Sequence, residues 1–559
     1  MWKLREHNKS KESEYNNSGF DKLLCRLLAQ RNIDDINSFL QCDYSSLSDP
    51  YLLTGTKEAS KLFCKIVLEK GTIGTYGDYD TDGIISSTMI NELCCSLNAK
   101  CQSYLPSRFK HGYGLNSKSV KYYIEDTKIP PDLLIILDCG SNSEQEVIQL
   151  KEWGVKNIIV IDHHNVIPNK MVRSCDVFIN WHMSNSLEMC TCGEVFQFIR
   201  AIRKLTKKID PVEFLSYAAI GTMADVTPII GDNRIIVKNG LLSTTLTKVS
   251  GSGLGSVIKS KYSNSLSQKD MSFQVIPKLN APGRLDSPDF VLKLLLERNT
   301  DKTDTMTLKL NEINDRRKKI QTEIDFQATQ KIESNIEEYK HGILIYDDNW
   351  NVGVVGVVAS KLVEKFKKPV VIAGKHNDIY KGSSRIYGDN SICEILESCK
   401  ELFTEFGGHR QAAGIKLNPD KISEANRVFN KACEQYFSNQ SHTECIRYYD
   451  AELKAETVST KTKNMLLDSL YPYCNINNPE PIFRIQGKIC DLSVKEGDGW
   501  AMMKFKVEQK GVKTDLDFTT FSPKYGTDIS GCDAMIYFSF QQGNFDNVVI
   551  EDVKIKGIE

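Results

Sequence analysis

The chain has 559 residues, of which 41% are hydrophobic and 26% are charged, and its formal net charge is −1. This length exceeds what a single hydrophobic core supports, so we expect about three or four domains. The composition excludes disordered, fibrous and membrane proteins. Because the net charge is close to zero, any nucleic acid would have to bind local basic clusters.

The sequence carries no pattern that favours export or membrane insertion. No stretch approaches the roughly 18 apolar residues of a membrane span, and the first ten residues, MWKLREHNKS, lack the apolar core of a signal peptide. The 17 cysteines are scattered, and Cys190 and Cys192 lack the CxxC spacing of a zinc site. We therefore expect a cytoplasmic protein with reduced, mostly buried cysteines, no structural zinc and no membrane partner.

The first part of the chain divides into a lead-in and an α/β domain. Residues 1–45 are polar with one amphipathic leucine stretch, which predicts a small helical lead-in. Residues 46–240 alternate helical patterns with apolar β-rich runs at Thr72–Tyr76, Leu133–Leu137 and Asn157–Ile161. Such alternation predicts βαβ units and a mostly parallel sheet.

Each of these three runs ends in polar residues. The first leads into GDYD, the second into Asp138-Cys139-Gly140, and the third into Asp162-His163-His164. In open α/β sheets, ligands bind just beyond the carboxyl ends of the strands. The sequence therefore predicts one shared site at that edge of the sheet.

Three further segments follow. Residues 241–335 are expected to form an interdomain segment with a long helix, whose apolar face includes Met306, Leu310, Ile313, Ile320 and Ile324. Residues 336–445 have a second, smaller α/β pattern. Residues 446–559 carry short strand-like runs between Gly and Asp turns, which predicts a small antiparallel barrel of the OB type. The expected fold class is thus multidomain α/β.

Asp78, Asp80 and Asp82 alternate in GDYDTDG. Three like charges this close repel one another unless a cation lies among them, and a hard divalent ion suits oxygen ligands. A calcium loop of the EF-hand type is the plainer alternative, but its twelfth position, which should be Glu, is Met89. The pattern favours a metal site of another kind.

The other candidate ligands are less specific when taken one at a time. Asp138 follows a strand and precedes a glycine, where an aspartate is more often a turn former or a helix cap. His163 and His164 follow a buried apolar run, where imidazoles serve as metal ligands about as often as structural groups. Asp225 ends an apolar helix-like run, and helix capping is its simplest interpretation.

Taken together, GDYDTDG, LDCG, DHH and ADV resemble, in order, the motifs of the DHH phosphoesterase superfamily. The resemblance implies two ions, Mn²⁺ with Mg²⁺ as an alternative. It implies that Asp80 and Asp82 each bind one ion, that Asp138 bridges both, and that His163 and Asp225 complete the second. His164 would face the scissile phosphate, and His163, His164 and Asp138 would be the catalytic residues.

Some superfamily members have a histidine where this chain has Tyr76, and we expect Asp78 to replace that ligand. Two ions about 3.5 to 4 Å apart lower the pKa of a shared water, orient it for in-line attack on phosphorus and offset the charge of the transition state. The resemblance thus implies phosphodiester hydrolysis without a covalent enzyme intermediate.

The second α/β pattern is similar to the DHHA1 substrate-binding domain through KGSSR and GGHRQAAG. Four further segments are similar to the RecJ branch, namely IPKLNAPGRLDS, WNVGVVGVVASKL, RFKHGYGL and NNPEPIF. The usual His-Pro of that branch is Asn351-Val352 here, and its ASR triplet ends in Lys361, which lacks the arginine fork. The implied substrate-binding residues are Arg108, Asn280, Arg284, Ser360, Lys361, Ser384, Arg385, Gly407, Gly408 and His409.

In the barrel, Trp500, Phe505 and Phe518 are candidates for stacking on bases, although a place in the barrel core is the more common fate of such rings. Basic residues could line a path for a single strand and make binding salt-dependent. The candidates are Arg108, Lys110, Arg284, Arg316 and Arg317.

The resemblance implies a single-stranded-DNA-specific 5′ to 3′ exonuclease that releases 5′-mononucleotides in DNA repair, recombination or replication. Single-stranded DNA would be its substrate, with a single-strand-binding protein and a helicase as expected partners. One alternative is a phosphodiesterase acting on short oligoribonucleotides or cyclic dinucleotides. Another is an inactive replication scaffold of the Cdc45 type, although such scaffolds typically lose metal ligands and every motif is filled here.

Overall fold

A computed structural model describes residues 1–33, 35–184, 187–243, 253–259, 266–388, 390–438, 446–474, 477–497, 500–521, 529–541 and 547–556. These residues form two compact units. The first unit comprises Met1–Pro106, Gly112–Ile276 and Glu444–Glu559, and the second comprises Ser107–His111 and Pro277–Thr443. The units cut across the contiguous ranges expected from the sequence, because the first unit holds both the parallel-sheet domain and the C-terminal barrel.

The first unit contains the expected parallel sheet, with the strand order β3-β2-β4-β5-β6. Its strands are β2 (Thr72–Gly77), β3 (Lys100–Tyr104), β4 (Leu133–Leu137), β5 (Asn157–Ile161) and β6 (Val177–Ile179). Every neighbouring pair runs parallel. All five residues of β4 are buried, as expected for a central strand covered on both faces.

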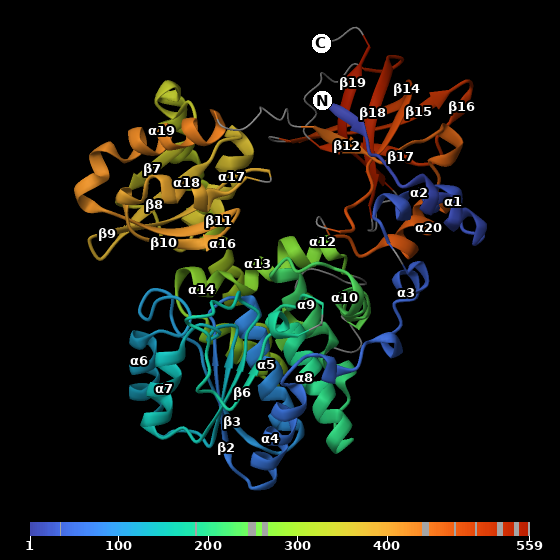
Figure 1. Cartoon of the computed structure of the whole chain (residues 1–559). Coiled ribbons are helices and arrows are strands. Elements are labelled where there is room, and N and C mark those ends of the chain that lie inside the picture. The colour runs from blue at the N-terminus through green and yellow to red at the C-terminus, as the bar shows by residue number, and fades with distance from the viewer. Residues whose placement is uncertain are drawn as a thin grey trace. The chain divides into compact units, whose positions relative to one another are not determined.

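Helices cover both faces of this sheet (Figure 1). On one side lie α6 (Ser117–Thr127) and α7 (Glu144–Trp153), whose Val120, Val147 and Leu150 pack against the strand residues Leu134 and Ile136. On the other side lie α4 (Thr56–Leu68), α5 (Thr81–Ser96) and α8 (Thr191–Thr206), followed by α9 (Leu215–Ala224) and α10 (Gly231–Ser243). The sheet thereby keeps only its carboxyl edge for chemistry.

The second unit contains a five-stranded mixed sheet with the order β10-β11-β9-β8-β7. The strands are β7 (Ile343–Asp347), β8 (Val370–His376), β9 (Ile379–Arg385), β10 (Phe403–His409) and β11 (Ala412–Leu417). Two cores fill the unit, one against α18 (Ile392–Ser398) and α19 (Ala425–Ser438), the other against α16 (Thr300–Ser334) and α17 (Val355–Phe366). The unit also holds α14 (Ala281–Leu285) and α15 (Asp289–Leu296).

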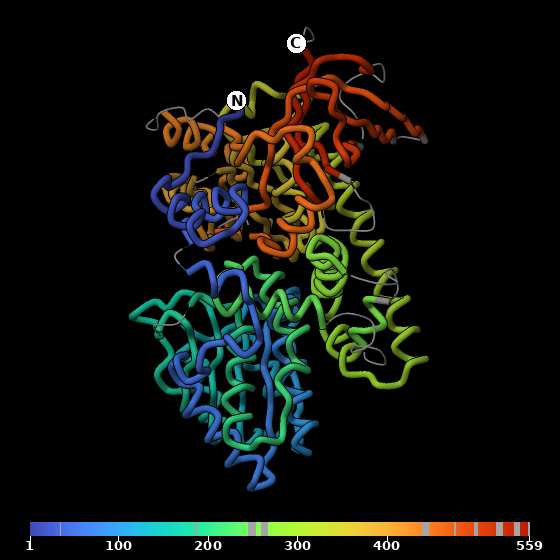
Figure 2. The backbone as a smooth tube through the Cα atoms, turned by 90° about the vertical axis from the view of Figure 1, so that its right-hand side faces the viewer, coloured from blue at the N-terminus to red at the C-terminus, as the bar shows by residue number. Residues whose placement is uncertain are grey.

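The long helix α16 is present, and the yellow-green tube of Figure 2 shows its length, but the predicted apolar face is only partly correct. Met306, Ile313 and Ile320 are only half-buried, whereas Asn314, Arg317 and Gln321 are buried. Arg317 donates to both of the others, through Nη2 to Asn314 Oδ1 at 2.8 Å and through Nη1 to Gln321 Oε1 at 2.9 Å. These hydrogen bonds allow three polar side chains to be buried on α16. Arg317 is therefore not available to line a path for a single strand, as the sequence had suggested.

The C-terminal part of the first unit is a closed five-stranded barrel, consistent with the OB type. Its strands are β14 (Phe483–Gly497), β15 (Trp500–Gln509), β17 (Asp517–Phe521), β18 (Asp533–Phe540) and β19 (Asn547–Ile555), and pairing of β14 with β15 closes the circle. The flanking pieces β13 (Ala451–Glu452) and β16 (Val512–Lys513) extend its edges.

The barrel aromatics correct one prediction. Phe505 and Phe518 stack on each other with centroids 5.8 Å apart and are 1% and 0% exposed, so they belong to the core and are not available to bases. The side chain of Trp500 lies outside the described residues. Inward-facing rings are what a small barrel needs to fill its interior.

The N-terminal segment packs on this barrel, as the blue and red parts show in Figures 1 and 2. Leu24, Leu27 and Leu28 of α2 (Lys22–Gln30) share one core with barrel residues, and this explains the amphipathic leucine stretch. Strand β1 (Trp2–Leu4) pairs in parallel with β12 (Arg447–Tyr449). The lead-in also includes α1 (Lys9–Asn17) and α3 (Ile36–Gln41), while α20 (Thr460–Leu470) precedes the barrel.

A buried arginine joins the parallel-sheet domain to the barrel within the first unit. Arg234 of α10 is 1% exposed, and its guanidinium lies 4.0 Å from the ring centroid of Phe39. It donates to five backbone carbonyls, those of Phe39, Ser469, Leu470, Tyr471 and Pro472, at 2.9 to 3.2 Å. Its planar set of donors binds a run of carbonyls at the end of α20, and Asn478 Nδ2 donates to two of them, Leu470 O and Pro472 O.

Replacing Arg234 by leucine should therefore destabilise the first unit by about 3 kcal/mol or more, since five carbonyls lose this donor, while Leu470 O and Pro472 O keep a second one, Asn478 Nδ2. Lys238→Leu is the matched control, because the half-buried Lys238, on the same helix, makes one hydrogen bond, to Asp468 O at 3.2 Å, and its loss should change stability by under about 0.5 kcal/mol. Chemical denaturation followed by circular dichroism measures both. Equal stability of the two variants would contradict the role given to Arg234.

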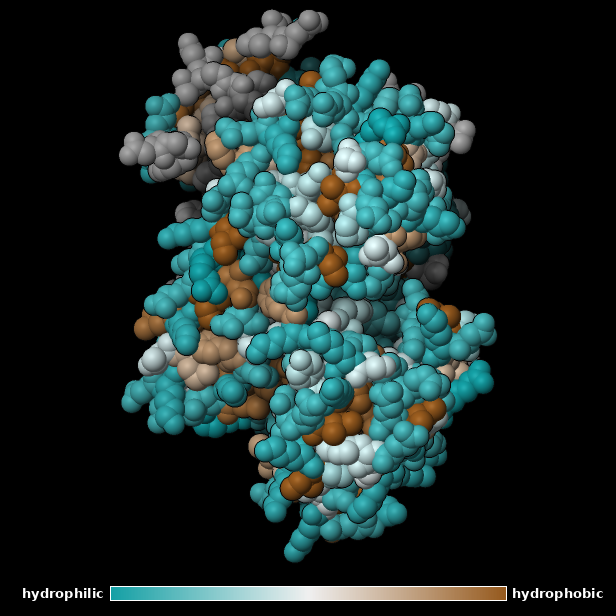
Figure 3. All heavy atoms as spheres, turned by 90° about the vertical axis from the view of Figure 1, so that its left-hand side faces the viewer, coloured by the Kyte–Doolittle hydropathy of each residue, from teal (hydrophilic) through white to brown (hydrophobic). Residues whose placement is uncertain are grey.

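Across the described residues, none of the helices has the length and apolar character that a membrane crossing requires. The face drawn in Figure 3 is mainly hydrophilic, with small and separate hydrophobic patches.

Candidate functional site

The acidic strand ends meet at the carboxyl edge of the parallel sheet. The strand pairing continues one residue past the strands, since Asp78 N donates to Leu137 O, Asp138 N to Ile161 O and Asp162 N to Ile179 O, at 3.0 to 3.2 Å. Asp138 then turns with φ 61°, a left-handed conformation that is uncommon for a residue with a side chain. Backbone geometry therefore brings these residues together.

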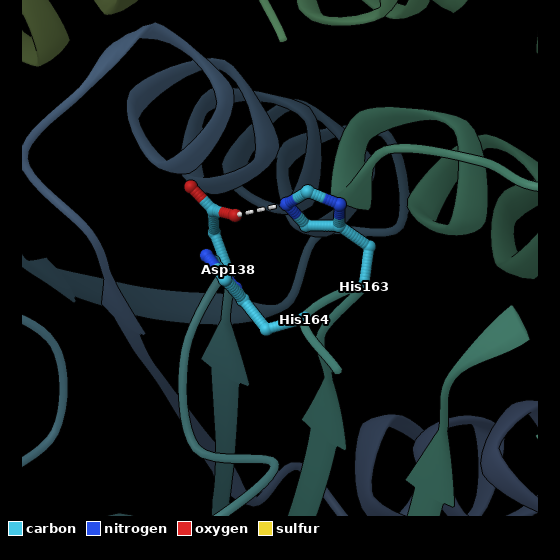
Figure 4. A group of neighbouring side chains, drawn as sticks. All are labelled: Asp138, His163 and His164. Atoms are coloured by element: carbon cyan, nitrogen blue, oxygen red, sulfur yellow. Dashed lines mark ion pairs between the residues drawn. The ribbon is translucent and has the colours of Figure 1, made fainter. Parts of the chain in front are cut away.

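Asp138 belongs to two compact groups of potential metal ligands. One group joins it to Asp78 and Asp80, the other to His163 and His164, with ligand atoms within 4.8 Å of one another in each group. Figure 4 shows Asp138 and His163 pointing toward each other, with His163 Nε2 3.3 Å from Asp138 Oδ1. On its other side His163 Nδ1 lies 3.5 Å from Asp225 Oδ2. A residue shared by two groups has the position required of a bridging ligand.

Charge crowding is the main electrostatic feature of the site. Burial raises the pKa of Asp138 well above its usual range, and the nearby charges of Asp80, Asp82 and Asp78 raise it further. Burial likewise raises the pKa of Asp225 to about 7, although His163 opposes the shift. Closely spaced carboxylates of this kind, with Asp138 and Asp78 buried, stay ionised when cations share the site.

Two of the predicted ligands also cap helices. Asp80 Oδ1 accepts from the backbone N–H groups of Asp82 and Gly83, at the start of α5. Asp82 is buried, and its two carboxylate oxygens accept from Thr191 N at 2.8 Å and Cys192 N at 2.9 Å, at the start of α8. Asp80 belongs to a ligand group as well, whereas the structure brings Asp82 into neither group.

Asp225 is positioned by an unusual backbone. It ends α9, and the next residue, Val226, has φ 55° and is 67% exposed. A β-branched residue in this region is strained, and such strain is found at sites where function fixes the chain direction. The turn places Asp225 Oδ2 beside His163.

His164 is held from its buried side by Asp162. His164 Nδ1 donates to Asp162 Oδ1 at 2.7 Å, and Asp162 Oδ2 accepts from Ser141 N at 2.8 Å. Burial lowers the pKa of His164, but the hydrogen bond and charge of Asp162 outweigh burial and raise it to about 9. Burial raises the pKa of Asp162, and the contacts with His164 reverse this effect and bring the pKa below its usual range. The aspartate of the DHH triplet thus orients a histidine.

Tyr76 stands where some superfamily members have a histidine. It is fully buried, and its hydroxyl donates to Gly114 O at 3.3 Å. Tyr76 therefore supports the loop around Gly114. Asp78, two residues on, lies in a ligand group, as expected if it replaces that histidine.

In the second unit, two of the predicted substrate-binding arginines lie near each other. Burial lowers the pKa of Arg385, and the positive charge of Arg108 lowers it further. Arg385 Nη1 donates to Ser383 Oγ at 2.6 Å and to Ser384 O at 2.8 Å, which fixes the guanidinium. Two neighbouring cations at the end of a strand are relieved by an anion, and phosphate suits their donors.

The remaining predicted substrate residues differ in what they contact. Ser384 is buried and donates to Ala413 O at 3.1 Å, so its hydroxyl is used within the sheet. Lys361 pairs with Asp325 of α16 at 3.5 Å, and Ser360 lies beside it on α17. Arg284 Nη1 donates to Gly353 O at 3.3 Å, and Asn280 precedes the same short helix.

The glycine motif lies on β10. Gly407, Gly408 and His409 are exposed and pair with Ala412–Gly414 of β11. A Cβ at Gly408 would lie 2.4 Å from Ala412 O, so only glycine permits this strand pairing. The motif thus presents exposed backbone with His409 at its end.

Sequence reasoning missed two residues at the site. Thr191 Oγ1 donates to Asp138 Oδ1 at 3.3 Å, and Tyr113 Oη lies 2.9 Å from His164 Nε2. Thr191 carried no signal, because a threonine at a helix start is usually interpreted as a cap. Tyr113 lay inside the RFKHGYGL segment, but that segment was noted for Arg108.

The donor set suits two divalent ions. Carboxylates predominate, one imidazole lies between Asp138 and Asp225, and oxygen-rich sites with a histidine favour Mn²⁺ or Mg²⁺ over softer ions. Of the predicted ligands, Asp78, Asp80, Asp138 and His163 lie in the two groups, Asp225 contacts His163, and Asp82 stays a predicted ligand that also caps α8.

Asp138→Asn tests this electrostatic account. A carboxyl whose pKa is raised by folding destabilises the protein once the pH exceeds its ordinary range, so removing the charge should stabilise the metal-free protein by roughly 1 kcal/mol at neutral pH. The same change should abolish the rise in Tm that Mn²⁺ causes in the wild type. Thermal unfolding with EDTA and with Mn²⁺ measures both. A variant that is less stable without metal would overturn the account.

Comparison with known proteins identifies two domains and several relatives. The DHH family, N-terminal domain, matches residues 72–222, and the DHHA1 domain matches residues 339–435. The chain is 26% identical over 504 residues to the single-stranded-DNA-specific exonuclease RecJ of Bacillus subtilis, covering 88% of this chain and 62% of that protein. It is 26% identical over 550 residues to the protein of the same name from Haemophilus influenzae, covering 94% and 93%.

Solved structures give the same fold. RecJ from Thermus thermophilus in complex with Mn²⁺ matches 99% of this chain and 79% of its own, with a TM-score of 0.81 and 21% identity. An exonuclease RecJ bound to manganese matches 70% of this chain and 96% of its own, with a TM-score of 0.59 and 26% identity. The expected architecture of DHH domain, DHHA1 domain and C-terminal barrel is therefore confirmed.

Proposed function

We propose that this chain, which carries the DHH and DHHA1 domains and is RecJ-like in sequence and fold, is a metal-dependent 5′ to 3′ exonuclease specific for single-stranded DNA. The observation that carries the proposal is Asp138, shared by two groups of ligands at the end of a buried strand. The chain spans 62% of the B. subtilis relative, so the activity of that whole protein comes to this chain as a proposal only.

The chain's own residues supply most of the arrangement. Asp78, Asp80, Asp82, Asp138, His163 and Asp225 would hold two Mn²⁺ or Mg²⁺ ions, which when bound activate water and offset charge at phosphorus. Thr191 and the left-handed turn at Asp138 fix the shared carboxylate before substrate arrives. Such preorganisation lowers the cost of reaching the transition state.

His164 is proposed to contact the scissile phosphate. Because Asp162 accepts from Nδ1, the Nε2 atom is directed away from the buried carboxylate. A protonated imidazole there can donate to a phosphate oxygen and stabilise its developing charge. Asp162 would stabilise that proton through its own charge.

Substrate binding is proposed to use the second unit. Arg108 and Arg385 would bind a phosphate of the strand, and the exposed backbone of Gly407 and Gly408 with His409 would approach another. Asn280, Arg284, Ser360, Lys361 and Ser384 remain proposed as substrate residues, with Ser384 acting by supporting the strand that carries Arg385. Cleavage would release 5′-mononucleotides.

The proposed substrate also suggests a setting. We propose action in the cytoplasm, in DNA repair, recombination or replication. A helicase and a single-strand-binding protein are the proposed partners, because a helicase produces single strands and a single-strand-binding protein holds them. The alternatives remain hydrolysis of short oligoribonucleotides or cyclic dinucleotides, and an inactive scaffold. The filled ligand positions favour an enzyme over a scaffold.

The decisive experiment digests 5′-labelled and 3′-labelled single-stranded DNA beside duplex DNA, RNA and cyclic dinucleotides, with Mn²⁺, Mg²⁺ or EDTA. We expect early release of the 5′ label as mononucleotide from single strands only, lost with EDTA and in the Asp138→Ala variant. Attack from the 3′ end, or activity confined to RNA or cyclic dinucleotides, would reject the DNA assignment. Inactivity on every substrate would favour the scaffold.

Arg385→Ala tests the phosphate contact separately. Loss of one fixed guanidinium should raise KM for single-stranded DNA about tenfold and flatten the dependence of KM on salt, with a smaller change in kcat. Arg427→Ala is the control, because Arg427 is exposed on α19 and pairs with Glu424. An unchanged KM and salt dependence in Arg385→Ala would remove this residue from the substrate path.

A further inference from the structure

We infer that Tyr113 is a positioning residue for His164, holding its imidazole from the solvent side while Asp162 holds it from the buried side. Tyr113 Oη lies 2.9 Å from His164 Nε2, and Asp162 Oδ1 lies 2.7 Å from Nδ1. With both ring nitrogens engaged, a ring flip would break two hydrogen bonds at once. The ring orientation is thereby selected before the substrate binds, and a phosphate oxygen would then replace Tyr113 Oη as the partner of Nε2.

The backbone on both sides of Tyr113 is held by two glycine turns and by hydrogen bonds. Gly112 and Gly114 adopt φ 94° and 60°, conformations that side chains disfavour, so the chain can present the tyrosine between two sharp turns. Gly114 O accepts from the buried Tyr76 hydroxyl at 3.3 Å and from Ser119 Oγ at 3.3 Å. Asn116 Nδ2 donates to Tyr113 O at 3.1 Å.

The side chain, by contrast, is anchored by few contacts. Tyr113 is 62% exposed, and its ring meets Tyr79 edge-on with centroids 6.2 Å apart and His164 edge-on at 6.3 Å. Such an exposed ring gains little from burial, so its hydroxyl contact with His164 is the specific interaction that it offers. Tyr76 therefore supports the loop that contains Tyr113.

Tyr113→Phe removes only the hydroxyl, and Tyr113→Leu also removes the ring. Tyr104→Phe is the control, because Tyr104 lies on the edge strand β3, belongs to neither ligand group, and its hydroxyl contacts Asp126 of α6. The kinetic measurement rests on the proposed function. Tyr113→Phe should lower kcat roughly tenfold with KM for single-stranded DNA changed less than about twofold, as expected for one lost hydrogen bond to a reacting group.

A second measurement does not depend on activity. In the metal-free protein with ¹⁵N-labelled histidines, the ring-nitrogen signals of His164, assigned with His164→Gln, should shift in Tyr113→Phe and stay unchanged in Tyr104→Phe. An inactive wild type would refute the proposed function, while this shift would still support the contact.

Three results would overturn the inference. One is an unchanged His164 signal in Tyr113→Phe. Another is an unchanged kcat in that variant of an active enzyme. The third is a rise in KM in Tyr113→Leu with wild-type kinetics in Tyr113→Phe, which would make the ring a contact for the strand instead.

Discussion

Repulsion among buried carboxylates is the constraint on which the active region depends. Asp138 is itself almost inaccessible to water and lies beside the buried Asp78 and the exposed Asp80, and its raised pKa reflects the cost of that position. The surrounding fold holds the charges in place nonetheless. Thr191 donates to Asp138, backbone N–H groups at the start of α8 donate to Asp82, and the sheet brings three strand ends to one edge. Cations complete such a site, and water alone does not.

Buried charged side chains in three parts of the fold are held by hydrogen bonds. Arg234 satisfies a bend of backbone carbonyls between the sheet domain and the barrel, and Asp162 satisfies both Ser141 N and the ring of His164. In the second unit, Arg317 allows a polar centre in α16. In each case a charged group is buried with several partners, so its removal costs more than any single bond would suggest.

Local sequence patterns predicted much of this fold. Apolar runs ending in acidic residues indicated β2, β4 and β5 and their shared edge, because strand direction and burial are local properties. The buried face of α16 and the inward rings Phe505 and Phe518 could not be predicted in the same way, since they depend on partners distant in the chain. The same is true of Asp82, whose capping partners Thr191 and Cys192 lie more than a hundred residues away.

The excursion of Ser107–His111 into the second unit has a practical consequence for dissecting the protein. A contiguous fragment from Pro277 to Thr443 would contain Arg385 but not Arg108 or Phe109, whose ring lies 6.1 Å from that of His376. A fragment cut at these borders would thus separate Arg385 from its neighbour Arg108. The two compact units are interleaved in sequence, so a minimal second unit would need the Ser107–His111 segment joined to Pro277–Thr443.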